Sequence, residues 1–176
     1  MAERDFVPVR IAVLTVSDTR TPADDRSGDT LVARIAAAGH TLAARDIVQD
    51  DRDAIVARLR EWIAEDGIDV IISTGGTGLT GRDVTVEAHR EVYEKQIDAF
   101  ATLFTMISVR KIGTSAVQSR ACGGVAQGTY LFALPGSPGA CKDGWDEILF
   151  HQLDYRHMPC NFVEIMPRLQ EHLRRK

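Results

Sequence analysis

The chain has 176 residues, a net charge of -4 at pH 7 and three cysteines. A chain of this length fits one domain spanning residues 1–176, which can bury roughly 70% of the surface that the unfolded chain exposes. The cysteines form no CxxC pair, which argues against a disulfide framework. The acidic balance attracts neither nucleic acid nor anionic lipid, and the sequence has no signal peptide and no run of about 20 apolar residues. We therefore expect a cytoplasmic protein that binds neither nucleic acid nor membranes.

The first half of the chain alternates strand and helix patterns. Residues 10–17 (RIAVLTVS) form a short apolar run rich in β-branched side chains, which predicts a buried strand. Residues 27–38 have apolar side chains at helical spacing and end before Gly39, the usual left-handed residue after a helix. Residues 42–48 predict a second strand, and residues 51–65 predict a second helix.

The second half continues this alternation. Residues 69–73 (DVIIS) predict a third buried strand that runs into a glycine-rich loop. Helical patterns follow at residues 84–93 and 97–107. Three further segments complete the chain: a short edge hairpin at residues 120–128, a buried strand at residues 130–134 (YLFAL), and a helix from the segment PGSP to about Leu149.

This alternation predicts an α/β fold, a three-layer α/β/α domain with a mainly parallel sheet. Residues 10–17 and 69–73 should be its central strands because both are apolar throughout. Ligands bind such sheets beyond the carboxyl ends of the strands. The loops that follow Ser17, Val48, Ser73 and Leu134 should therefore meet at one edge of the sheet.

The loop after the third strand has the composition of a phosphate site. Gly75, Gly76 and Gly78 lack Cβ atoms, so backbone N–H groups can approach an anion there. A pair of glycines alone more often makes a tight turn. Three glycines interleaved with Thr74 and Thr77 favour a binding loop.

The same loop contains the pattern GxGxxG at residues 76–81, which is typical of dinucleotide-binding proteins. That motif belongs after the first strand and requires an acidic residue at the end of the next strand, where this chain has a helical pattern. A nicotinamide oxidoreductase is therefore a weak alternative. Because Arg82 closes the loop in place of a lysine, a P-loop NTPase is also disfavoured.

Two aspartates lie at loops that should meet beyond the strands. Asp50 follows the second strand and Asp83 follows the glycines. Such carboxylates can hold Mg²⁺ and bridge it to substrate phosphates. Both also lie at predicted helix starts, where aspartate is a favoured N-cap. Asp51 competes with Asp50 for either role, and spacing alone does not separate them.

Two other loops carry groups that suit a phosphate. Ser137, with Pro135 and Gly136 before it, should begin the helix after the last strand. Ser17 follows the first strand, and two arginines near it, Arg20 and Arg26, would add positive charge. The five histidines show no metal-ligand spacing, so we expect them at the surface: His40, His89, His151, His157 and His172.

Four motifs in order, TVSDTR, SGD, STGGTGLTGRDVT and ALPGSPGAC, resemble the MoaB/MogA family of molybdenum cofactor biosynthesis. The similarity runs from about Arg10 to past Cys160, and the segment QLDYRHMPCNF is more similar to the MoaB branch. The resemblance implies a molybdopterin adenylyltransferase that uses ATP and Mg²⁺. It places the functional aspartates, which would also bind the metal, at Asp50 and Asp83. It places the ligand-binding residues at Ser17, Thr74, Gly75, Gly76, Thr77, Gly78, Pro135, Gly136 and Ser137.

The family resemblance leaves an alternative in which the protein binds molybdopterin as a non-catalytic scaffold. It also implies a homo-oligomer, a trimer or hexamer, and a molybdate-inserting enzyme as partner. Residues 97–107 carry four large apolar side chains that could form the oligomer interface or pack in the core: Phe100, Leu103, Phe104 and Met106.

Overall fold

The structure is a computed structural model that describes residues 4–174. Six strands form one sheet in the order β2-β1-β3-β6-β5-β4. Neighbouring strands from β2 to β6 run parallel, and β5 pairs antiparallel with both β6 and β4. The strands are β1 (Arg10–Val16), β2 (Thr41–Val48), β3 (Val70–Thr74), β4 (Lys95–Gln96), β5 (Cys122–Ala126) and β6 (Thr129–Leu134).

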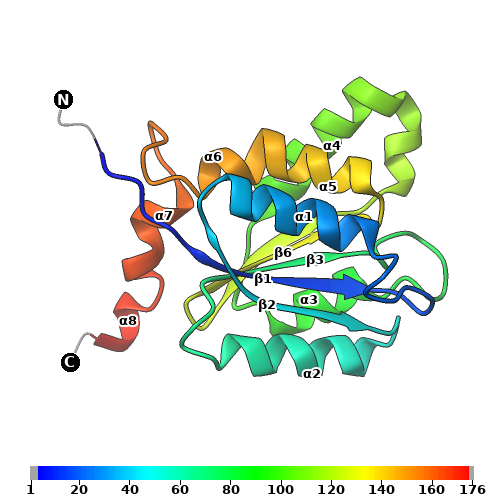
Figure 1. Cartoon of the computed structure of the whole chain (residues 1–176), viewed down its shortest axis with the longest axis horizontal. Coiled ribbons are helices and arrows are strands. Elements are labelled where there is room, and N and C mark those ends of the chain that lie inside the picture. The colour runs from blue at the N-terminus through cyan, green and yellow to red at the C-terminus, as the bar shows by residue number, and fades with distance from the viewer. Residues whose placement is uncertain (1–3, 175–176) are drawn as a thin grey trace.

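Helices cover both faces of the sheet (Figure 1). Helices α1 and α5 lie on one face, and α2 and α3 lie on the other. The α-helices are α1 (Arg26–Ala37), α2 (Arg52–Ile63), α3 (Thr85–Val92), α4 (Asp98–Ile112), α5 (Pro138–Gly144), α6 (Phe150–Gln152), α7 (Phe162–Ile165) and α8 (Glu171–Arg174). Two 3₁₀ segments, η1 (Gly113–Gln118) and η3 (Met166–Arg168), and one π-helical segment, η2 (Trp145–Leu149), complete the elements.

The alternation of side chains along β1 builds the two halves of the core. Ile11 and Val13 pack with the side chains of α1, α4 and α5, whereas Ala12 and Leu14 pack with those of α2. All four are fully buried. This pattern requires helices on both faces of the sheet, and it confirms the three-layer α/β/α fold with a mainly parallel sheet.

The predicted central strands are confirmed. Strand β1 is hydrogen-bonded to β2 and β3, and β3 is hydrogen-bonded to β1 and β6. Strand β3 begins and ends one residue later than predicted. The Asp69 carboxylate before it accepts hydrogen bonds from the backbone and side chain of Arg10. Gly39 ends α1 with a positive φ of 83°, as the sequence predicts.

The edge prediction for residues 120–128 is wrong. Strand β5 forms a hairpin with β6 through Gln127 and Gly128, both with positive φ, and the two-residue strand β4 takes the edge position instead. Strand β4 lies between the two predicted helices and is too short to show strand periodicity in the sequence. The helix that opens at PGSP continues through η2 into α6 and therefore ends three residues later than predicted.

Helix α4 divides its large apolar residues between core and surface. Phe100 and Phe104 are buried, whereas Leu103 and Met106 are 47% and 59% exposed. Two of the four residues considered for an interface therefore belong to the core. The longest helix among residues 4–174 has 15 residues, and none is long and apolar enough to cross a membrane.

Candidate functional site

The loops that follow β1, β2, β3 and β6 meet at one edge of the sheet, as predicted. The backbone N–H of Gly75 donates to the Leu134 carbonyl (3.0 Å), and the Asp50 N–H donates to the Asp18 carboxylate (3.1 Å). These contacts surround a cavity of about 290 Å³. We call it the rim cavity. Six predicted residues line it together with Arg20 and Ser27: Ser17, Asp50, Thr74, Gly75, Gly76 and Gly136.

Gly75 and Gly76 make the loop that the sequence predicts as an anion site. Their φ angles are 100° and 64°, values that L side chains rarely adopt. A Cβ on Gly75 would lie 2.2 Å from the Val16 carbonyl oxygen, and one on Gly76 would lie 2.5 Å from Thr85 Oγ1. The loop is held closed by Thr85, whose hydroxyl donates to the Gly75 carbonyl (2.7 Å). These glycines are therefore required both by backbone conformation and by close packing.

The structure separates Asp50 from Asp51. The Asp51 side chain caps α2 by accepting a hydrogen bond from the Ala54 N–H (2.8 Å). Asp50 instead lines the rim cavity, and no side chain among residues 4–174 donates a hydrogen bond or forms an ion pair with its carboxylate. Burial, and then the negative charge of Asp18, raise the pKa of Asp50. The charge of Arg82 partly offsets this rise in pKa without forming an ion pair with Asp50. Asp50 is therefore not an N-cap, and no ion pair holds it within the described residues.

Asp83 does not cap a helix either. Val84 is the N-cap of α3 and makes no side-chain cap hydrogen bond. The Asp83 carboxylate instead accepts hydrogen bonds from the Thr80 amide (2.9 Å) and hydroxyl (2.7 Å). Burial opposes ionisation of Asp83, but the hydrogen bonds from Thr80 outweigh it and lower the pKa. Asp83 lies beside Gly78, outside the lining of the rim cavity.

The other predicted ligand-binding residues do not line the rim cavity, and Pro135 and Ser137 line a separate cavity between α4 and α5. Pro135 accepts a hydrogen bond at its carbonyl from the Thr74 hydroxyl (3.0 Å). Ser137 caps α5 by accepting from the Ala140 N–H (3.1 Å). The carbonyls of Thr77 and Gly78 accept hydrogen bonds from Arg120.

Two ion pairs stabilise the loops and have no signal in the sequence. Arg82 donates from Nε (3.0 Å) and Nη2 (2.7 Å) to the Asp18 carboxylate, which joins the glycine loop to the loop after β1. Arg120 forms an ion pair with Glu87 at the start of α3. Their partners lie 64 and 33 residues away along the chain, so no local pattern indicates them.

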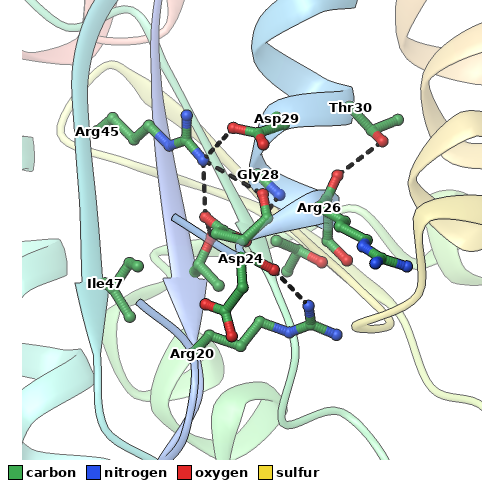
Figure 2. Close-up of polar contacts among 12 residues, drawn as sticks. Arg20, Asp24, Arg26, Gly28, Asp29, Thr30, Arg45 and Ile47 are labelled. Atoms are coloured by element: carbon green, nitrogen blue, oxygen red, sulfur yellow. Dashed lines mark hydrogen bonds and ion pairs between the residues drawn. The ribbon is translucent and has the colours of Figure 1, made fainter. Parts of the chain in front are cut away.

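Two further ion pairs, both formed by one arginine, fix the start of α1; the pair with Asp29 is labelled in Figure 2. Arg45 on β2 reaches Asp25 (2.9 Å) and Asp29 (2.8 Å). Asp25 is fully buried, caps α1 and accepts from the Thr15 hydroxyl (2.7 Å). Burial would raise the pKa of Asp25, but hydrogen bonds from Thr15 and Arg45 outweigh it and lower the pKa. This cluster positions Ser27 at the rim cavity.

The surface prediction is wrong for two histidines. His40 and His89 are buried, and His89 is not exposed at all. His89 lies one helical turn after Thr85 on the face of α3 that packs on the sheet. Its ring nitrogens contact the Ser73 hydroxyl (2.7 Å) and the Tyr93 hydroxyl (2.9 Å). Burial lowers the pKa of His89 to about 3, so the ring is neutral at physiological pH.

This burial predicts a pH-dependent loss of stability. An unfolded histidine titrates near pH 6.5, so below that pH the unfolded chain binds a proton that the folded chain excludes until about pH 3. The stability present above pH 6.5 should therefore fall by up to about 1.4 kcal/mol per pH unit as the pH decreases. Urea unfolding between pH 4 and 8 should show a shallower pH dependence for His89→Gln than for wild type. The exposed His151 supplies the control, since equal slopes for His89→Gln and His151→Gln would contradict the prediction.

A mainly parallel sheet with a glycine loop and a cavity at its carboxyl edge defines a class of α/β protein whose site is suited to phosphate-bearing ligands. Residues 12–155 match the family described as a probable molybdopterin binding domain. The chain is 46% identical over 158 residues to molybdenum cofactor biosynthesis protein B of Escherichia coli K12, covering 90% of this chain and 93% of that protein. It is 39% identical over 146 residues to the protein of that name from Bacillus subtilis, covering 82% and 86%.

Solved structures agree with this assignment. A crystal structure of a molybdenum cofactor biosynthesis protein B has a TM-score of 0.84 at 34% identity, covering 97% of this chain and 99% of that one. The tungsten cofactor synthesizing protein MoaB from Pyrococcus furiosus has a TM-score of 0.72 at 29% identity, covering 96% and 98%. The chain therefore belongs to the MoaB/MogA family of molybdenum cofactor biosynthesis proteins, on its MoaB branch.

Proposed function

We propose that this protein is a molybdopterin adenylyltransferase that works in the cytoplasm. In this reaction the terminal phosphate of molybdopterin attacks the α-phosphate of ATP. The bond between the α- and β-phosphates breaks, which yields adenylylated molybdopterin and pyrophosphate. The observation that carries the proposal is that Asp50 lines a cavity beside the glycine loop and forms no ion pair among residues 4–174.

The chemistry suits the residues of the rim cavity. Transfer of a nucleotidyl group asks the protein mainly to position the phosphates and neutralise their charge, without a nucleophilic side chain. At the end of β3 the Gly76 N–H is free of any acceptor among residues 4–174, whereas the Gly75 N–H donates to the Leu134 carbonyl. Ser17 supplies a hydroxyl from the β1–α1 loop, and the Ser27 hydroxyl at the start of α1 donates to the Gly136 carbonyl (2.7 Å).

Asp50 fits a magnesium ion because Mg²⁺ takes carboxylate oxygens and keeps its remaining positions for water and substrate phosphates. Asp50 would bind the ion directly. Asp83, at the far end of the glycine loop, would supply the second carboxylate for the ion. No group of three or more histidine, cysteine, aspartate or glutamate side chains among residues 4–174 is close enough to form a complete metal cage. The bound ion would neutralise the charge of a phosphate next to Asp50. Without the ion, the Asp50 carboxylate would repel that phosphate.

The test is incubation of the purified protein with molybdopterin, Mg²⁺ and labelled ATP. Appearance of label in molybdopterin, together with pyrophosphate, would support the transferase. Binding of molybdopterin without transfer of label would instead support the non-catalytic scaffold. If the protein is the transferase, its product, adenylylated molybdopterin, would pass to a molybdate-inserting enzyme as partner.

We also propose that the protein is a homo-oligomer with threefold symmetry, a trimer or hexamer. Leu103, Met106, Val109 and Ile112 on α4 are each about half exposed, which leaves an apolar surface suited to contact with a second copy. Light scattering at micromolar concentration should give a mass of three or six chains. A monomer in that measurement would contradict the proposal.

A further inference from the structure

The rim cavity is lined by one arginine, Arg20, which lies half-buried on the loop between β1 and α1. Three other arginines near the site are engaged by carboxylates: Arg82 by Asp18, Arg120 by Glu87 and Arg45 by Asp25 and Asp29. No carboxylate among residues 4–174 lies within ion-pair distance of Arg20. Arg20 therefore lines the cavity without forming an ion pair in the described part of the chain, although hydrogen bonds from Thr21, and then the charge of Arg20, lower the pKa of the nearby Asp24 carboxylate.

The loop holds Arg20 in place while leaving most of its donors free. The Arg20 backbone N–H donates to Ser17 Oγ (3.1 Å), and Nη1 donates to the Asp24 carbonyl (2.9 Å; Figure 2). The Asp24 carboxylate accepts instead from the Thr21 amide (2.6 Å) and hydroxyl (3.0 Å). A guanidinium has five N–H donors in a planar fork. One protein acceptor therefore leaves several donors for a ligand.

Gly76, which also lines the rim cavity, adds a backbone donor. The Gly76 N–H donates to no acceptor among residues 4–174. The preceding amide, that of Gly75, donates to the Leu134 carbonyl (3.0 Å), so Gly76 is the residue of this pair that can offer its N–H to an anion. The cavity thus combines an unpaired guanidinium with a free amide, and both complement a phosphate oxygen.

We propose that Arg20 contacts a phosphate of the ligand in the rim cavity and sets the preference of this site for phosphate esters. The proposal rests on the proposed function, which brings two phosphate esters to the protein, molybdopterin and ATP. Arg20 and Asp50 line the same cavity with opposite charges. Arg20 therefore attracts the phosphate directly, whereas Asp50 needs a cation between its carboxylate and the phosphate.

Arg26 offers a matched control for Arg20. It lies six residues further on, is exposed and does not line the rim cavity. Arg20→Gln and Arg26→Gln remove the same charge from nearby positions, so a general electrostatic effect would change both variants equally. Arg20→Lys keeps the positive charge but removes the planar guanidinium. This variant therefore distinguishes a bidentate hydrogen-bonded contact from attraction by charge alone. Thermal melting of each variant checks that the fold is retained.

The experiment is calorimetric titration of wild type and the three variants with molybdopterin alone, ATP with Mg²⁺ alone, and pyrophosphate alone. Arg20→Gln should weaken binding of at least one of the phosphate ligands by about tenfold or more, because a hydrogen bond to a charged group contributes about 1.5–3 kcal/mol. Arg20→Lys should fall between wild type and Arg20→Gln, and Arg26→Gln should stay within about twofold of wild type. The ligand that loses affinity identifies which phosphate Arg20 contacts.

Two results would overturn the proposal. One is binding of all three ligands by Arg20→Gln within twofold of wild type. The other is an equal loss in Arg20→Gln and Arg26→Gln, which would assign the effect to overall charge. Because the titrations need no turnover, a scaffold that binds molybdopterin without transferring AMP would still show the loss in Arg20→Gln. Failure of the proposed function and failure of this inference are therefore distinguishable.

Discussion

Replacement of Asp50 by asparagine is expected to lower the rate of adenylylation by about 10²–10³-fold while the fold persists. Asparagine keeps the size of the side chain and removes its charge. The Asp50 carboxylate accepts no side-chain hydrogen bond from residues 4–174, so the substitution breaks no such contact of the folded chain. The lower rate should therefore come from weaker neutralisation of the charge on the phosphate that is transferred. Labelled-ATP assays and thermal melting of wild type and Asp50→Asn measure the two quantities.

Asp51→Asn is the control for this prediction. Asp51 caps α2, and asparagine caps helices about as well as aspartate. Both the rate and the melting temperature should stay near the wild-type values. A collapse of activity in Asp51→Asn, with a normal rate in Asp50→Asn, would show that the wrong aspartate has been assigned.

Asp83→Asn tests the second carboxylate. Its rate should also fall by orders of magnitude, since Asp83 is proposed to act jointly with Asp50. Asp83 differs from Asp50 in holding the glycine loop through two hydrogen bonds from Thr80. Asp83→Asn should therefore lower the melting temperature more than Asp50→Asn does. Near-wild-type rates in both variants would contradict the joint role.

The second large effect is expected at Gly75. Gly75→Ala places a Cβ 2.2 Å from the Val16 carbonyl oxygen, a backbone atom that cannot move aside, at a φ of 100°. Backbone strain and overpacking each cost about 1–3 kcal/mol. We expect a loss of about 3 kcal/mol, which corresponds to roughly 10 °C in melting temperature for a chain of this size. Loss of ligand binding should accompany it, because the loop forms one wall of the rim cavity.

Gly81 lies in the same loop and serves as the control. A Cβ on Gly81 would meet no atom within 4 Å. Gly81→Ala should therefore melt within a few degrees of wild type. Equal melting temperatures for Gly75→Ala and Gly81→Ala would show that the close approach of Gly75 to Val16 does not constrain the loop.

The amino-acid sequence by itself determined the fold class and the edge of the sheet that carries the site. Apolar runs such as residues 10–17 and 69–73 are buried on both faces because helices cover both faces, and this information is local to each run. Parallel strands then bring the loops after them to one edge whatever their side chains are. For that reason the order of strands and helices along the chain was enough to place Gly75, Gly76 and Asp50 together.

The tertiary structure decided what each polar residue does, because its partners come from distant parts of the chain. Spacing could not separate Asp50 from Asp51 as N-caps, whereas the Ala54 N–H selects Asp51 as the cap and leaves Asp50 to the cavity. His89 has no local pattern that predicts burial, and it is buried because α3 packs its ring against Ser73 on β3. Arg20 and Arg26 were equal candidates in the sequence, and the path of the β1–α1 loop directs Arg20 alone of the two to the rim cavity. Periodicity records which face of an element is buried, but hydrogen bonds and ion pairs between elements depend on the three-dimensional packing that only the folded chain provides.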